Sequence, residues 1–188
     1  YIGGLRVTDA ETLKVARDVF LDVNLQLVNR LEELGTPARP VTGGVFEAVV
    51  KDETLGYVGE VTKVDTRNVS AAYEGGYLPV VMPLAETAEG QILNINADVA
   101  AREMALAVKP LKTIFINAKG GWVEPDGTKL SAISISSDYE EMAGRDYTGR
   151  QVGIYYMRRT GFHCLSVCHC LSLSLSLSIY LSIYIYIY

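Results

Sequence analysis

The chain has 188 residues and a net charge of −5, from 17 basic and 22 acidic side chains. This length fits one domain or a part of one, and scattered basic residues in an acidic chain argue against a nucleic-acid-binding groove. The first 161 residues contain neither histidine nor cysteine, which excludes imidazole bases, thiol nucleophiles and Cys/His metal sites from that part of the chain.

The first predicted element is a long helix that follows an extended segment, residues 1–9. Thr8 and Glu11 have the spacing of a capping box, which predicts a helix start. Gly35 and Pro37 predict its end. Between these limits an apolar residue recurs every three or four positions, giving one stripe that must pack on a sheet or a partner subunit: Leu13, Ala16, Phe20, Val23, Leu27, Leu31 and Leu34.

A hairpin, a short helix and a buried strand are predicted next. Residues 45–50 and 57–64 are the expected strands of the hairpin, with Lys51-Asp52-Glu53 in the turn. A short helix over 69–74 is ended by two glycines. Residues 77–84 are apolar on both faces, which favours a buried strand of a parallel sheet.

The centre of the chain combines carboxamides with a helix start. In the segment 90–98, apolar residues alternate with Asn94 and Asn96, Asp98 follows, and an alanine-rich helix is predicted over 99–108. Asn96 is a suitable cap for this helix. A helix start also offers free N–H donors and a partial positive charge, so the same place could hold an anion. The spacing alone favours the simple cap over the anion site.

Strands and helices continue to alternate after the central segment. Residues 112–117 are predicted as another buried strand, which opens into Lys119, Gly120 and Gly121. The alternation predicts the α/β class with a largely parallel sheet. Ligands of such sheets gather beyond the carboxyl ends of the strands, where Asn94 and this glycine loop would lie.

The end of the chain, from Phe162, has a different composition. It holds both histidines and all three cysteines, and it finishes in alternating Leu-Ser and Ile-Tyr repeats. CT and AT dinucleotide repeats translate into these pairs, so we interpret residues 151–188 as an aberrant, disordered tail from simple-sequence DNA. Two alternatives are weaker. The uncharged stretch 171–188 is barely long enough for a membrane span and has no basic flank, and the Cys and His spacing matches no common zinc ligand pair.

Four short motifs are spread over the chain: Gly4-Leu5-Arg6-Val7-Thr8-Asp9, Gly43-Gly44-Val45-Phe46, Leu55-Gly56-Tyr57-Val58-Gly59-Glu60-Val61 and Leu93-Asn94-Ile95-Asn96-Ala97-Asp98. Together they resemble the N-acetylglutamate kinases of the amino acid kinase family, and the wording is most similar to the fungal mitochondrial type. There the kinase is part of a precursor that also carries N-acetylglutamyl-phosphate reductase. The resemblance covers residues 2–139 and is specific, because the motifs occur in the family's order.

The resemblance implies an amino acid kinase-like fold, with an open, mostly parallel sheet sandwiched by helices. Residues 1–150 would form a domain fragment that is incomplete at both ends. It also implies phosphorylation of the side-chain carboxylate of N-acetylglutamate by ATP with Mg²⁺, an early step of arginine biosynthesis. Arg6 and Asn94 would then bind the substrate's α-carboxylate, a task that suits a guanidinium and a carboxamide. Asp98 would be the catalytic acidic residue that organises the lysines, and the Lys119-Gly120-Gly121 loop would contact the nucleotide.

Each of these residues also has a simpler interpretation. Arg6 could be a surface ion-pair residue, Asp98 an acidic residue in the first turn of a helix, and Lys119-Gly120-Gly121 a plain turn. The chain also departs from the family pattern. The family's first strand and two glycine-rich loops would precede Tyr1, and its second catalytic lysine would follow Arg150. We therefore expect this chain alone to be inactive.

Partners and location follow from the same resemblance. It implies a homo-oligomer in the full-length parent, N-acetylglutamate synthase as a further partner, and the mitochondrial matrix, with the targeting segment absent from this chain. Neither a nucleic acid nor a membrane is expected as a partner. The alternative from a different class is a non-catalytic regulatory module that binds acetylglutamate or arginine and docks on a partner enzyme.

Overall fold

A computed structural model describes most of the first 116 residues and a few later stretches: 5–110, 112–116, 128, 132–134, 164–166 and 183–187. The chain divides into two compact units, residues 1–107 and 108–188, and each is described by itself. No helix in the described ranges is long and apolar enough to cross a membrane.

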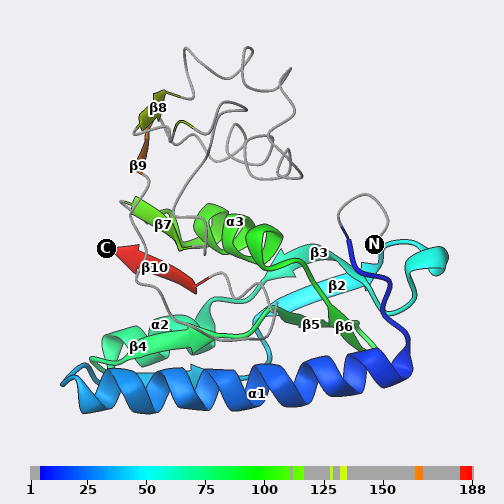
Figure 1. Ribbon diagram of the computed structural model, residues 1–188, viewed down its shortest axis with the longest axis horizontal. Helices are drawn as coiled ribbons and strands as arrows, with labels where there is room; N and C mark the ends of the chain where they lie inside the picture. Colours follow the sequence, from blue (N-terminus) through cyan, green and yellow to red (C-terminus); the bar gives the residue numbers. More distant parts are fainter. Residues whose placement is uncertain are drawn as a thin grey trace. The chain divides into compact units, whose positions relative to one another are not determined.

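The first element of the larger unit is the predicted long helix, α1 (Ala10–Glu33) (Figure 1). It ends as predicted, because Gly35 adopts a left-handed φ of 84° and the Thr36 N–H donates to the Leu31 carbonyl at 2.9 Å. The predicted capping box is wrong by one residue. Asp9, not Thr8, caps the helix by accepting a hydrogen bond from the Thr12 N–H at 2.7 Å.

A four-stranded mixed sheet follows α1, and the predicted hairpin forms one side of it. The hairpin pair is antiparallel, the next pair is parallel, and the last is antiparallel. A short 3₁₀ turn, Glu53–Leu55, lies in the hairpin connection. In spatial order the strands are β3 (Gly59–Val64), β2 (Phe46–Val50), β5 (Leu84–Glu86) and β6 (Ile92–Asn94).

A second, parallel pair of strands consists of β1 (Ala38–Val41) and β4 (Leu78–Val81). Helix α1 and the predicted short helix, α2 (Arg67–Glu74), both pack on this pair. The single strand predicted over 77–84 is therefore wrong, since the chain leaves β4 at Met82 and enters the other sheet at β5. Pro83 lies at this crossing, where its missing N–H cannot interrupt a strand ladder.

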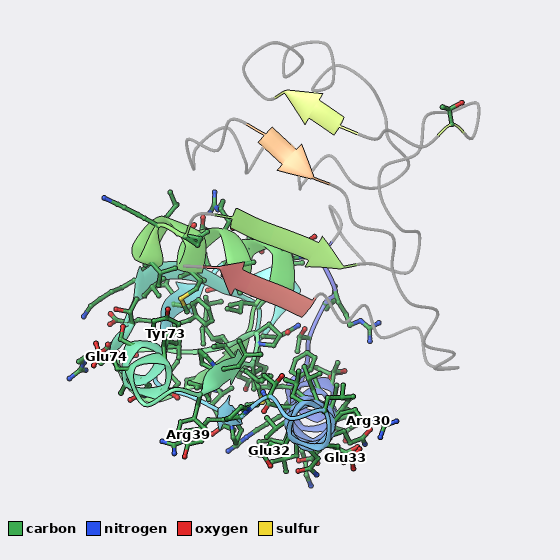
Figure 2. The ribbon with its side chains drawn as sticks, turned by 90° about the vertical axis from the view of Figure 1, so that its left-hand side faces the viewer. Arg30, Glu32, Glu33, Arg39, Tyr73 and Glu74 are labelled. Atoms are coloured by element: carbon green, nitrogen blue, oxygen red, sulfur yellow. The ribbon has the colours of Figure 1, made fainter. Side chains whose placement is uncertain are left out.

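Charged side chains lie at the C-terminal ends of α1 and α2: Arg30, Glu32 and Glu33 on α1, and Glu74 on α2 (Figure 2). Arg30 and Glu33 form an ion pair there, and the Arg39 guanidinium lies 4.1 Å from the centroid of the Tyr77 ring. Such exposed pairs contribute little to stability, and this end of the unit is an ordinary solvated surface.

The core of the unit lies where β6 and the following helix bury their apolar side chains. Helix α3 (Ala97–Val108) is the predicted alanine-rich helix. Leu93 has 0% of its surface exposed and Met104 has 2%. The small buried side chains of α3 are Ala100, Ala101 and Ala105.

The second unit contains two described strand pairs, both antiparallel. One of its strands is the predicted strand after α3, and two others lie in the segment expected to be an aberrant tail. The division at residue 150 and the disorder of that tail stay predictions. The pairs are β7 (Lys112–Ile116) with β10 (Ile183–Ile187), and β8 (Ala132–Ser134) with β9 (Cys164–Ser166).

Strands and helices thus alternate along the chain, and the predicted α/β class is confirmed.

Candidate functional site

Three distant segments meet at the backbone of Tyr57. The Tyr57 N–H donates to the Thr8 carbonyl at 2.7 Å, and the Tyr57 carbonyl accepts from the Asn94 N–H at 2.9 Å. The Thr8 N–H donates in turn to the Leu55 carbonyl at 2.9 Å. The extended segment before α1, the hairpin connection and the end of β6 are therefore held side by side by main-chain hydrogen bonds.

The side chains of Thr8 and Asn94 complete this junction. Thr8 has 0% of its surface exposed. Its Oγ1 accepts a hydrogen bond from Asn94 Nδ2 at 3.2 Å and donates one to the Arg6 carbonyl at 3.0 Å. The Arg6 backbone and the Asn94 carboxamide, 88 positions apart in the sequence, thus contact the same hydroxyl. We call Arg6, Thr8, Tyr57 and Asn94 the Thr8 junction.

Two helices begin beside the Thr8 junction. Helix α1 begins two residues after Thr8, and α3 begins three residues after Asn94. Figure 1 shows β6 beside the N-terminal end of α1. Helix N-termini carry partial positive charge and N–H donors. The exposed Arg6 lies in the same region, and so do the carboxylates of Asp9, which caps α1, and of Asp98 in the first turn of α3.

Asn96 caps α3 as predicted. Its Oδ1 accepts hydrogen bonds from the Asp98 N–H at 2.9 Å and the Val99 N–H at 3.2 Å. Asp98 itself is half-buried in the first turn of the helix. An acidic residue in this turn complements the helix dipole, so its place is consistent with a structural role as well as a catalytic one.

The structure brings the backbone carbonyl of Arg6 and the side chain of Asn94 together at the Thr8 hydroxyl, and Asp98 is the second residue of α3, four positions after Asn94. The predicted nucleotide residues Lys119, Gly120 and Gly121 lie outside the described residues. The roles of all these residues stay predictions.

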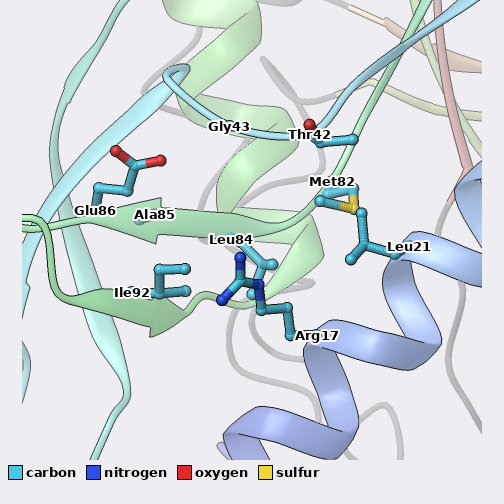
Figure 3. A pocket seen from close by; sticks show the side chains of 9 residues that line it. All are labelled: Arg17, Leu21, Thr42, Gly43, Met82, Leu84, Ala85, Glu86 and Ile92. Carbon is cyan, nitrogen blue, oxygen red and sulfur yellow. The ribbon is translucent and has the colours of Figure 1, made fainter.

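A small pocket lies on the face of the β5–β6 hairpin that carries Asn94. Leu84 pairs with Asn94, and Glu86 pairs with Ile92, so these four side chains share one face. The pocket, of about 120 Å³, is closed on the other side by Arg17 and Leu21 of α1 (Figure 3). This volume is below the roughly 300–1,000 Å³ of ordinary ligand sites, and we do not assign a ligand to the pocket.

Metal ligands do not cluster in the described ranges, where no group of three or more His, Cys, Asp or Glu side chains could hold an ion.

The sequence interpretation did not assign Thr8 and Tyr57 of the Thr8 junction, or the adjacent Gly56, to the site. Thr8 was assigned to a capping box, although its hydroxyl is used at the junction. Gly56 has a φ of 69°, and a Cβ on it would lie 2.3 Å from the Thr8 carbonyl oxygen. The glycine after Leu55 was the one available signal of a close backbone approach.

Comparisons with known proteins agree with this fold. The profile of the amino acid kinase family matches residues 2–152. The solved structure of smu.665 from Streptococcus mutans is similar, with a TM-score of 0.77 and 28% sequence identity over 85% of this chain and 67% of that one.

Two curated relatives are more similar in sequence. Protein arg-6, mitochondrial, from Neurospora crassa is 51% identical over 140 residues, which are 74% of this chain and 16% of that protein. Acetylglutamate kinase from Xylella fastidiosa is 44% identical over 142 residues, which are 75% of this chain and 34% of that protein. The chain therefore spans between about one sixth and one third of the length of these relatives.

Proposed function

The chain belongs to the amino acid kinase family, and on that premise we propose that it is part of a kinase that phosphorylates the side-chain carboxylate of N-acetylglutamate in arginine biosynthesis. The observation that carries the proposal is the Thr8 junction, where one hydroxyl links the Arg6 backbone to the Asn94 carboxamide beside two helix starts. The name of the Xylella fastidiosa relative supports this choice of substrate.

In this proposal the junction binds the α-carboxylate of N-acetylglutamate. The Arg6 guanidinium supplies a charge-assisted hydrogen bond, and an Asn94 N–H supplies a directional one. The helix N-termini add to the attraction of the dianionic substrate. Binding at the α-carboxylate leaves the side-chain carboxylate as the phosphoryl acceptor.

The reaction is an in-line phosphoryl transfer. A side-chain carboxylate oxygen forms a bond to the γ-phosphorus of ATP, while the bond from that phosphorus to the β,γ-bridging oxygen breaks and ADP leaves with the electron pair. The protein needs to position the reactants and neutralise charge, and it forms no covalent intermediate itself. A chain whose first 161 residues lack His and Cys is suited to such chemistry.

Asp98 and the glycine loop complete the proposed site. Asp98 would orient the catalytic lysines, and Lys119, Gly120 and Gly121 would contact ATP. Mg²⁺ would arrive as MgATP, because this ion is commonly held by substrate phosphates with one or two carboxylates.

We further propose a homo-oligomer, an association with N-acetylglutamate synthase and a mitochondrial matrix location. The name of the Neurospora crassa relative supports the mitochondrial part.

A graft tests the proposed activity directly. The 142 aligned residues of the Xylella fastidiosa acetylglutamate kinase would be replaced by those of this chain. We expect the hybrid to convert N-acetylglutamate and ATP into an acyl phosphate, which hydroxylamine traps as a hydroxamate. The same hybrid with Arg6→Ala should show a raised KM for N-acetylglutamate. A folded hybrid that binds ATP and gives no hydroxamate would contradict the proposal.

The 188-residue chain alone is expected to give no hydroxamate, since it spans only about one third of the length of the Xylella fastidiosa kinase. Measurable turnover by the purified chain would contradict this expectation.

Calorimetry separates the kinase from a regulatory module. A kinase must bind both N-acetylglutamate and MgATP. Binding of N-acetylglutamate or arginine without binding of MgATP would favour the regulatory module.

A further inference from the structure

We infer that Thr8 is a positioning residue that fixes which way the Asn94 carboxamide faces. The inference rests on the proposed function, because it concerns the residue that would present an N–H to the substrate's carboxylate. Thr8 was not among the predicted site residues. It is fully buried and has no access to the substrate, so any effect on binding must pass through its neighbours.

The number of protons at the junction decides the orientation. A threonine hydroxyl has one hydrogen to donate and lone pairs to accept with. Thr8 donates its hydrogen to the Arg6 carbonyl at 3.0 Å, so towards Asn94 it can only accept. The Asn94 group that faces Thr8 must therefore be the NH₂, at 3.2 Å, and not the carbonyl oxygen. One hydroxyl thus distinguishes two ends of a carboxamide that have nearly the same shape.

The backbone on both sides of this contact is held in place. Tyr57 donates to the Thr8 carbonyl and accepts from the Asn94 N–H. Thr8 and Asn94 therefore cannot move apart without breaking main-chain hydrogen bonds. The freedom that remains at the contact is rotation about the side-chain torsions of Asn94. The Thr8 hydroxyl restrains the last of these, which decides whether the NH₂ or the carbonyl oxygen faces it.

The restraint matters because one orientation of the Asn94 carboxamide attracts an anion and the other repels it. With one N–H turned to Thr8, the second N–H is available to a carboxylate. A carboxamide turned by 180° exchanges its N–H groups and its carbonyl oxygen, and an oxygen directed at a carboxylate is repulsive. Since the same hydroxyl also contacts the Arg6 carbonyl, Thr8 couples the two residues proposed to bind the α-carboxylate.

Three variants of the full chain test this role. Thr8→Val keeps the shape and removes the hydroxyl, and Thr8→Ser restores the hydroxyl with one methyl fewer. Thr8→Ala replaces the valine if the valine variant does not fold. The first readout is the pair of Asn94 Nδ2 proton resonances in ¹⁵N-labelled protein without ligand. We expect Thr8→Val to shift the bonded proton and to speed its exchange with water, and Thr8→Ser to restore both.

The second readout is the affinity for N-acetylglutamate. We expect Thr8→Val to weaken binding by about tenfold, the loss of roughly one hydrogen bond to a charged group, and Thr8→Ser to stay within about threefold of the natural chain. In an Asn94→Ala background Thr8→Val should have no further effect, because its action passes through Asn94. A merely structural role would cost the same affinity in both backgrounds.

The outcomes separate this inference from the proposed function. Unchanged Asn94 Nδ2 resonances in Thr8→Val, or an equal loss of affinity in both backgrounds, would overturn the positioning role and leave the proposed function standing. If the natural chain itself does not bind N-acetylglutamate, the proposed binding site fails. The Asn94 resonances then still decide whether Thr8 orients the carboxamide.

Discussion

Gly56 occupies a position where a side chain cannot be added without moving the backbone of Thr8. Its φ is 69°, and a Cβ on it would lie 2.3 Å from the Thr8 carbonyl oxygen. That oxygen already accepts the Tyr57 N–H that holds the Thr8 junction together. The close approach therefore links a backbone requirement to the geometry of the candidate site.

We expect Gly56→Ala to lower the free energy of unfolding by more than about 2 kcal/mol. A residue with a Cβ is strained by about 1–3 kcal/mol at a φ of 69° and a ψ of −129°, and the added Cβ also collides with Thr8. Urea denaturation measures this loss. Gly76→Ala is the matched control, because Gly76 has a φ of 81° with nothing within 4 Å of the added Cβ. Equal losses in the two variants would show that the contact with Thr8 has no energetic consequence.

At the scale of residues, local chemistry was predictable and distant partners were not. Asn96 was predicted to cap α3, because a carboxamide followed by an alanine-rich run needs no information from elsewhere in the chain. Thr8 was misassigned as a cap because its real partner, Asn94, is 86 positions away. Only the fold reveals that the Thr8 hydroxyl is already engaged.

Asn24 joins helix α1 to strand β4 across the packed interface between them. It has 5% of its surface exposed, and its Nδ2 donates to the Val80 carbonyl at 2.8 Å. Its Oδ1 finds no partner among the described residues. The bond fixes the helix against the strand at one defined point in an otherwise apolar contact.

We expect Asn24→Ala to cost about 1–3 kcal/mol of stability, because it leaves a buried carbonyl without its donor. Gln26→Ala is the control on the exposed face of the same helix, where Gln26 donates a hydrogen bond to Asp22, and it should change stability by less than about 0.5 kcal/mol. Thermal unfolding of the two variants checks this difference. A neutral Asn24→Ala would show that the interdigitated apolar side chains alone hold α1 in place.

The start of helix α2 depends on a carboxylate. Hydrogen bonds from the Arg67 guanidinium, and then from the Arg67 N–H, lower the pKa of Asp65 to about 2. Because the pKa is lower in the folded chain than the usual 3.9, this stabilisation is present above about pH 4 and is lost as the pH falls towards 2.

We therefore expect Asp65→Asn to lower the urea midpoint at neutral pH, and the difference from the natural chain to shrink between about pH 4 and pH 2. Arg67→Ala should produce the same narrowing, since it removes the partner. A difference that stays constant down to pH 2 would mean that the carboxylate is not what the helix start requires.

The spacing of apolar residues predicted all three helices, but only some of the strands. The helices α1, α2 and α3 each carry their own start, stripe or stop signal. The sequence pattern did not predict strand β1. Its Pro40 is tolerated because β4 is its one partner among the described strands. The chain changes sheet at Pro83 because β4 pairs with β1 and β5 pairs with β6, and a local sequence pattern does not predict such pairings.

For the whole molecule, the candidate site has the cationic Arg6 beside two helix starts in a chain whose net charge is −5. In the proposed site Arg6 supplies the positive charge, and Asn94 supplies the directional donor. The motif sequences predicted Arg6 and Asn94 as site residues, and their roles stay predictions. The motifs could not predict the arrangement of these residues, because it depends on main-chain hydrogen bonds between segments about 40 to 50 positions apart.

The most direct test of the account is an isothermal titration of N-acetylglutamate into the full chain and into its Arg6→Ala, Asn94→Ala and doubly substituted forms. We predict that the natural chain binds, that each single change weakens binding by about tenfold or more, and that the double change costs less than the sum, because both residues hold one carboxylate. Binding that is unaffected by both substitutions, in folded proteins, would contradict the claim that Arg6 and Asn94 form one substrate site.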